Sequence, residues 1–137
     1  MTYSISELDR CGCEAAHVRL LKSVRIRTTE RLLDVAKSPK GRKQLRTKTG
    51  INERLLLRWA NTADRMRIKG VGKENAELLE AAGVNTVREL KYRNPAKLAA
   101  AMRAANRKRK LVSILPSEAT VGRWIEEARR LPLKISY

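Results

Sequence analysis

Aromatic side chains are scarce in this sequence. It holds no phenylalanine, three tyrosines and two tryptophans, so aromatic residues make up only 4% of its 137 residues. The hydrophobic core must therefore be built from leucine, isoleucine, valine, alanine and the tryptophans. Leucine and alanine enter helices at little cost, and this composition favours helices over strands. The length is that of one ordinary domain.

Long apolar runs are also missing. No segment approaches the ~20 apolar residues that a membrane-spanning helix needs, and residues 1–10 lack the apolar stretch of a secretory signal. The same segment carries Glu7 and Asp9, which argues against a transit peptide. We therefore expect a cytoplasmic protein with no membrane partner. Cys11 and Cys13 are too close for a useful structural disulfide, and reduced thiols agree with that location.

Residues for metal binding or nucleophilic catalysis are few. Cys11, Cys13 and His17 offer three soft ligands, but a structural zinc site needs four, and the sequence holds no other cysteine or histidine. We expect these three residues to be buried and inert, with no metal and no cofactor. A single histidine also leaves no credible Ser/His/Asp set. The sequence therefore predicts a protein that is not an enzyme.

What the sequence does contain is an internal repeat. Leu20-Leu21 aligns with Leu78-Leu79 at an offset of 58 residues, Ser38-Pro39 with Asn94-Pro95 at 56, and Trp59 with Trp124 at 65. Three landmarks in one order argue against chance. We predict two pseudo-repeats, residues 1–66 and 67–137, which form one compact all-α unit of about eight to ten short helices without a sheet.

Capping signals support this helical interpretation. Thr86 and Glu89 have the spacing of a capping box, and Ser38 and Asn94 each precede a proline at the first helical position. Further expected caps are Asn52 and Ser117 at helix starts, and Gly50 and Gly83 at helix ends. Both tryptophans fall within apolar helical stripes, so we expect them in the core rather than stacked on bases.

The charge is strongly one-sided. Lysine and arginine number 31 against 14 aspartate and glutamate residues, a net charge of +17. Such a charge favours a polyanionic partner, although solubility or an acidic protein partner would also account for it. Residues 37–58 hold eight basic residues and one acid, and residues 88–110 hold nine and one. The two stretches lie at corresponding places of the repeat, which favours a shared electrostatic surface.

The sharpest local pattern is residues 68–79, which resemble the helix-hairpin-helix motif. In that motif a tight turn that contains glycines links two helices. The turn glycines of this sequence would be Gly70 and Gly72. Glycine permits unusual backbone conformations and a close approach of a phosphate to the N–H groups that begin the next helix. We expect Val71 to point inward and Ala76 to let the helices pack closely. A compact turn that packs helices or docks a protein remains the alternative.

The matching hairpin of the first repeat is eroded. Gly12 is retained, but Glu14 stands where the second repeat has Gly72, and Arg25 replaces Gly83. A carboxylate at the turn would repel phosphate, so we expect this hairpin to be structural, with its cysteines filling the turn.

Nearly the whole chain resembles an uncharacterised bacterial family of tandem helix-hairpin-helix proteins, a domain of unknown function. The segments that carry the likeness are residues 39–42, 49–51, 59–72, 78–84, 93–95, 115–117, 124–125 and 131–137. The resemblance implies an all-helical fold and DNA binding. DNA glycosylases that contain this motif use a catalytic aspartate further along the chain, whereas the last aspartate here is Asp64, before the hairpin. That enzymatic role is therefore disfavoured.

These observations favour a non-enzymatic protein that binds the backbone of double-stranded DNA with low sequence selectivity. A location at the nucleoid is compatible with that function. A ribosome- or RNA-associated protein and a protein-interaction module are the alternatives. The residues expected to contact nucleic acid are Lys69, Gly70, Val71, Gly72, Lys73 and Asn75 at the hairpin, Lys40, Arg42 and Lys43 in the first basic stretch, and Arg107, Lys108, Arg109 and Lys110 in the second.

Overall fold

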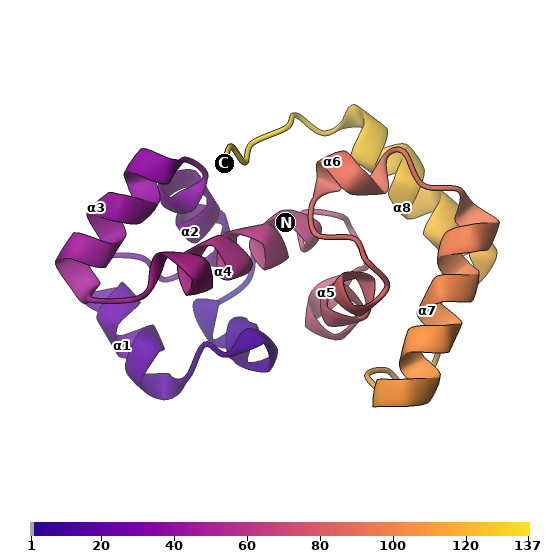
Figure 1. Ribbon diagram of the computed structural model, residues 1–137, viewed down its shortest axis with the longest axis horizontal. Coiled ribbons are helices and arrows are strands. Elements are labelled where there is room, and N and C mark those ends of the chain that lie inside the picture. Colours follow the sequence, from indigo (N-terminus) through magenta and orange to yellow (C-terminus); the bar gives the residue numbers. More distant parts are fainter. Residues whose placement is uncertain (1) are drawn as a thin grey trace.

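The computed structural model describes residues 2–137 as a succession of short helices (Figure 1). Within these residues the only β-type pairing is a single bridge between Ser4 and Thr28, so the all-α prediction is confirmed. In chain order, the elements are the 3-10 helix η1 (Ile5–Cys11) and the α-helices α1 (Ala15–Ser23), α2 (Thr29–Ala36), α3 (Pro39–Thr49), α4 (Glu53–Arg65), α5 (Gly72–Ala81), α6 (Val87–Leu90), α7 (Pro95–Arg109) and α8 (Glu118–Arg130).

Helix α4 runs through the middle of the molecule. Helices α1 to α3 lie around it in one half of the molecule, and helices α5 to α8 lie beyond its C-terminal end in the other half (Figure 1). The short helix η1 packs against both α4 and α5, so the two halves share a contact surface. The C-terminal segment returns to the first half, where the backbone N–H of Ser136 donates to the carbonyl of Lys37 at 2.8 Å.

The helix ends follow the capping signals of the sequence. The side chains of Ser38, Asn52, Asn94 and Ser117 each accept a hydrogen bond from a first-turn N–H group. The expected capping box between Thr86 and Glu89 forms at the start of α6. Gly50 and Gly83 adopt left-handed φ values of +76° and +93° after α3 and α5. Local sequence therefore sets where these helices begin and end.

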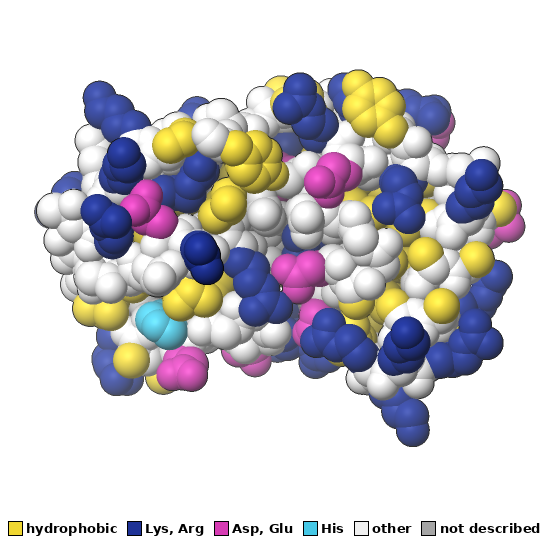
Figure 2. All heavy atoms as spheres, in the orientation of Figure 1, with side chains coloured by type: hydrophobic (Ala, Val, Ile, Leu, Met, Phe, Trp, Pro, Cys, Tyr) yellow, Lys and Arg dark blue, Asp and Glu magenta, His cyan; other side chains and the backbone are white. Residues whose placement is uncertain are grey.

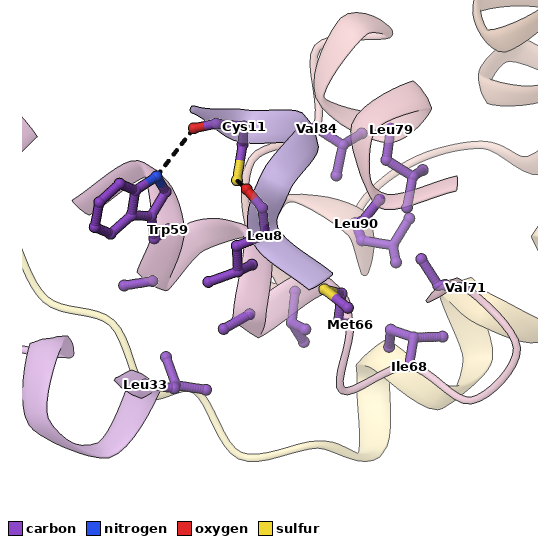
Figure 3. Close-up of a cluster of buried hydrophobic side chains, with 14 of the residues drawn as sticks. Leu8, Cys11, Leu33, Trp59, Met66, Ile68, Val71, Leu79, Val84 and Leu90 are labelled. Atoms are coloured by element: carbon purple, nitrogen blue, oxygen red, sulfur yellow. Dashed lines mark hydrogen bonds between the residues drawn. The ribbon is translucent and has the colours of Figure 1, made fainter. Parts of the chain in front are cut away.

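Both tryptophans are core residues, as expected. Trp59 in α4 is 0% exposed and Trp124 in α8 is 3% exposed. The indole N–H of Trp59 donates to the carbonyl of Cys11 at 2.9 Å, which ties α4 to the end of η1 (Figure 3). Cys11 and Cys13 are free and buried.

His17 differs from the expectation, because it is only partly buried. Its ring lies edge-on to Trp59 with the centroids 5.1 Å apart. Its Nδ1 accepts the backbone N–H of Glu14 at 3.1 Å. The imidazole is held at the start of α1, where it covers one side of the Trp59 ring and still reaches the surface.

A buried arginine connects α4 to the second half. Arg65 is 1% exposed, and its guanidinium donates to the carbonyls of Ala76 at 2.9 Å and Asn85 at 2.7 Å, and to the hydroxyl of Thr62 at 3.1 Å. A buried guanidinium requires such partners. Arg65 thereby fixes helix α5, and with it the turn that precedes α5, relative to α4.

Candidate nucleic-acid interface

The turn between α4 and α5 places two glycines in left-handed conformations. Gly70 has φ +87° and Gly72, the first residue of α5, has φ +65°. A Cβ added at Gly72 would meet nothing within 4 Å. The backbone is therefore open to the approach of a ligand at this point. Val71 is 3% exposed and Ala76 is 0% exposed, so both have the inward positions expected of them (Val71 is labelled in Figure 3).

The N-terminus of α5 differs from most helix starts in this protein. The preceding residue, Val71, provides no side-chain hydrogen bond to the first turn. Helices α6, α7 and α8, by contrast, begin at side chains that accept such a bond. The first N–H groups of a helix have no partner within the helix and attract anions. At α5 no capping side chain occupies these N–H groups, so they remain available to an anion.

The polar residues of the turn are partly engaged within the protein. The ammonium of Lys73 lies 3.1 Å from a carboxylate oxygen of Glu7 and 3.5 Å from one of Asp9. The hydrogen bond with Glu7 raises the pKa of Lys73. Lys69 is exposed, but its backbone N–H donates to the carboxylate of Glu127 at 3.2 Å. Asn75 is half-buried, and its buried Oδ1 accepts no hydrogen bond from residues 2–137.

The first basic stretch divides into two kinds of residue. Lys40 and Lys43 are exposed on α3, beside an open hollow of about 560 Å³. Arg42 on the same helix is only 5% exposed, and its guanidinium donates to the carbonyls of Ala36 at 2.9 Å and Ser136 at 2.8 Å. Arg42 therefore holds the C-terminal segment against α2 and α3, instead of facing solvent as the prediction required.

The second basic stretch forms the end of α7. Arg107, Lys108 and Arg109 occupy its last turn, and Lys110 ends the helix with a left-handed φ of +49°. All four side chains are exposed. Cations at a helix C-terminus also stabilise the helix by interacting with its dipole. Arg109 lies 3.9 Å from a carboxylate oxygen of Glu77, so its charge is partly balanced.

The structure does not gather the predicted contact residues into one patch. The hairpin residues lie together beside α5, near the middle of the molecule. Helices α3 and α7, which carry the two basic stretches, lie toward opposite ends of the long axis (Figure 1). Basic side chains are spread over both ends of the face shown in Figure 2. A ligand that touches all three regions must therefore be extended.

One feature of the interface was missed from the sequence. A hollow of about 420 Å³ lies beside the turn, and it is lined by Lys69, Gly70, Thr120, Arg123, Trp124 and Glu127. Four of these residues come from α8, some fifty residues away along the chain. Arg123 stands outside both basic stretches, so charge density along the sequence gave no signal for it.

Among residues 2–137, no group of three or more His, Cys, Asp or Glu side chains is placed to hold a metal ion. In the same part of the chain, no helix is long and apolar enough to cross a membrane.

These features define a small all-α protein of short capped helices with an open, glycine-containing turn. The chain belongs to the family described as a domain of unknown function (DUF4332), which matches residues 11–131. The predicted membership of an uncharacterised family is confirmed at that level. No curated protein and no solved structure matches the chain.

Proposed function

We propose that this protein is not an enzyme and binds the phosphate backbone of double-stranded DNA, with low sequence selectivity, at the turn between α4 and α5. The observation that supports this most directly is the start of α5. No side chain caps its first N–H groups. A Cβ added at Gly72 would have no other atom within 4 Å, so the space beside this residue is open. A phosphate oxygen can therefore approach the backbone closely. Contacts of this kind position a protein on DNA without reading bases.

We interpret the chain as two pseudo-repeats, each built around a helix-hairpin-helix. Gly12 and Gly70 have φ values of +85° and +87°, and Arg25 and Gly83 have φ values of +66° and +93°. Each pair is separated by 58 residues. Helices α1 to α4 and α5 to α8 follow in the same order after these turns. Residues 58 positions apart thus share a left-handed conformation in both repeats. This supports a common backbone pattern, even at position 25, where arginine stands in place of glycine.

The first hairpin lacks the properties that favour phosphate at the second. Glu14 is the residue at the start of α1, and its backbone N–H is already bonded to His17. A carboxylate at this position repels an anion. We therefore assign a structural role to the first hairpin and phosphate binding to the second.

The exposed lysines of α3 and the basic end of α7 extend the proposed interface. The lysines of α3 lie toward one end of the long axis, and the basic end of α7 lies in the other half, beside α5. Together they suit a long polyanion better than a compact ligand. Each phosphate neutralised by lysine or arginine releases condensed counterions, so affinity should fall with salt. Duplex RNA has the same backbone charge, and the experiment below separates the two.

The test is a fluorescence-anisotropy titration of labelled duplex DNA, duplex RNA and single strands across a salt series. The variant Gly72→Glu adds a carboxylate at the proposed phosphate contact. Gly50→Glu is a matched control, because Gly50 also has a left-handed φ and also has nothing within 4 Å of an added Cβ. Both variants change the net charge equally. Circular dichroism and thermal unfolding establish that each variant is folded.

We expect Gly72→Glu to weaken duplex DNA binding at least tenfold more than Gly50→Glu. Equal losses would mean that the affinity comes from diffuse charge and would overturn the assignment to the turn. Affinity without salt dependence would overturn backbone binding altogether. Tighter binding of duplex RNA than of duplex DNA would favour the RNA-associated alternative.

A further inference from the structure

The two tryptophans occupy corresponding positions of the two pseudo-repeats, but only one of them has a hydrogen-bond acceptor for its indole N–H in the described part of the chain. Trp59 donates its N–H to the carbonyl of Cys11, directly before the turn glycine Gly12. Trp124 lies beside the other turn glycine, where a Cβ at Gly70 would be 3.8 Å from its Nε1. Trp124 is 97% buried, yet its N–H donates to no residue between 2 and 137.

This unpaired donor borders the hollow beside the turn. In Figure 3 the pale yellow ribbon of the C-terminal region passes close to the loop that carries Ile68 and Val71. The hollow there measures about 420 Å³ and has Trp124, Gly70, Lys69 and Arg123 in its lining. The Nε1 of Trp124 is not among the side-chain N and O atoms that are both fully buried and unpaired, so the N–H remains accessible from the hollow. A ligand oxygen in the hollow can therefore accept a hydrogen bond from it.

The charged groups around the hollow favour an anionic ligand. Within residues 2–137, neither the ammonium of Lys69 nor the guanidinium of Arg123 forms an ion pair with a carboxylate. The guanidinium of Arg123 makes one hydrogen bond, to the Thr120 hydroxyl. A neighbouring hollow of about 720 Å³ shares Lys69 and Arg123 and adds Arg129 and Arg130. Arg129 is paired with Glu126, which leaves Lys69, Arg123 and Arg130 as unpaired cations.

One carboxylate also lines the hollow. Glu127 accepts the backbone N–H of Lys69 at 3.2 Å and 3.3 Å through its two oxygens. This contact holds α8 against the turn. The Lys69 N–H also balances part of the negative charge of the Glu127 carboxylate. Its remaining charge opposes an anion in the hollow, so the affinity for an isolated anion should be modest.

We propose that this hollow is a phosphate-binding site in which the indole N–H of Trp124 donates to a phosphate oxygen, while Lys69 and Arg123 balance its charge. This inference rests on the proposed function for the kind of ligand, since a nucleic-acid strand bound at the turn supplies a phosphate here. It adds a second phosphate contact, made by side chains of α8, to the backbone contact at Gly72.

The experiment follows the two indole N–H signals of the ¹⁵N-labelled full-length chain by nuclear magnetic resonance. The sequence holds only two tryptophans, so the variant Trp59→Phe assigns both signals. Three ligands are titrated: inorganic phosphate, a duplex with 5′-phosphates and the same duplex with 5′-hydroxyls. We expect the Trp124 signal to shift on addition of ligand while the Trp59 signal stays in place.

The three ligands distinguish the source of the phosphate. A response to both duplexes identifies a backbone phosphate, and a response only to the 5′-phosphorylated duplex identifies a strand end. If the protein binds duplex DNA but Trp124 responds only to inorganic phosphate, nucleic acid does not reach the site, and the proposal as stated is overturned. An unchanged Trp124 signal with all three ligands would also overturn it.

Variants separate this site from general charge. Arg123→Ala should reduce the Trp124 shift at least fivefold, whereas Arg31→Ala, an exposed arginine on α2, should leave it unchanged. Glu127→Gln keeps an acceptor for Lys69 and removes the charge, so it should strengthen phosphate binding. Weaker binding by Glu127→Gln, or equal effects of the two arginine variants, would contradict the site.

Failure of this inference and failure of the proposed function give different results. If the protein binds duplex DNA and Gly72→Glu abolishes it, but the Trp124 signal never responds, only the site on α8 is lost. If no nucleic acid binds and inorganic phosphate still shifts Trp124, the hollow is an anion site and the proposed function is lost.

Discussion

The ammonium of Lys73 lies 3.1 Å from a carboxylate oxygen of Glu7, so the lysine at the turn of the second half is neutralised by the 3-10 helix of the first. Asp9 is a second partner at 3.5 Å. The sequence favoured Lys73 as a phosphate contact, but the fold supplies two competing anions. Any phosphate at the turn must share Lys73 with them.

Removing these carboxylates should strengthen DNA binding. The double variant Glu7→Gln, Asp9→Asn keeps the side-chain shapes and releases Lys73 for phosphate. We expect tighter binding of duplex DNA and a salt dependence of log affinity that is steeper by about one counterion. Anisotropy titrations at several salt concentrations measure both quantities.

The control for this variant is Glu30→Gln, which removes one exposed carboxylate from α2, away from the turn. If twice the gain in binding free energy from Glu30→Gln equalled the gain from the double variant, overall charge rather than the turn would be responsible.

The two tryptophans should differ in their contribution to stability. Trp59→Phe leaves the carbonyl of Cys11 without its donor, whereas Trp124→Phe removes no hydrogen bond within residues 2–137. Both variants lose buried ring area. We expect Trp59→Phe to lower the free energy of unfolding by about 1 kcal/mol more than Trp124→Phe does. Urea unfolding followed by circular dichroism makes the comparison, and equal losses would speak against the difference.

Neighbouring basic residues on α3 should separate stability from binding. Arg42→Ala leaves the carbonyls of Ala36 and Ser136 without donors, and should cost about 1–3 kcal/mol of stability. Lys43→Ala changes an exposed residue, so its effect on stability should stay within about 0.5 kcal/mol.

The same pair should behave in the opposite way toward DNA. Lys43→Ala should reduce the salt dependence of binding by about one counterion, while folded Arg42→Ala should bind as the unmodified protein does. Unfolding curves and anisotropy titrations on both variants test this. If Arg42→Ala lost affinity for DNA and Lys43→Ala did not, Arg42 would be a DNA-contacting residue after all.

The two thiols should be unreactive in the folded protein. Burial raises the pKa of Cys13 to about 12 from its ordinary value of 9.0, and burial also raises the pKa of Cys11. Because the thiolate is the reactive form, a disulfide reagent near neutral pH should modify both cysteines only after unfolding. Rapid modification of the native protein would contradict this burial.

The same shifts predict the direction of the pH dependence. The folded state holds the thiol protons more tightly than the unfolded state, so the stability is complete below pH 9.0 and falls as the pH rises toward about 12. Substitution of Cys13 by alanine should flatten this fall, which chemical unfolding at a series of pH values would detect.

Local signals in the sequence placed the helices well. Ser38, Asn94 and Thr86 start helices because each side chain bonds a backbone N–H within three residues, and no distant contact is needed. The apolar stripes around Trp59 and Trp124 identified the buried faces of their helices. Helical periodicity depends only on the spacing of residues close together in the sequence. The open turn at Gly70 and Gly72 was also visible, because glycine spacing reports backbone conformation.

The sequence alone therefore determined the all-α class, the helix boundaries, the buried tryptophans and the glycine turn, all of which depend on neighbours along the chain. Only the tertiary structure decided which charges are free. It buried Arg42 against Ser136, paired Lys73 with Glu7, and placed Arg123 beside Lys69. These contacts join residues about fifty or more positions apart, and a long-range contact is fixed by how the helices pack rather than by the residues next to each partner.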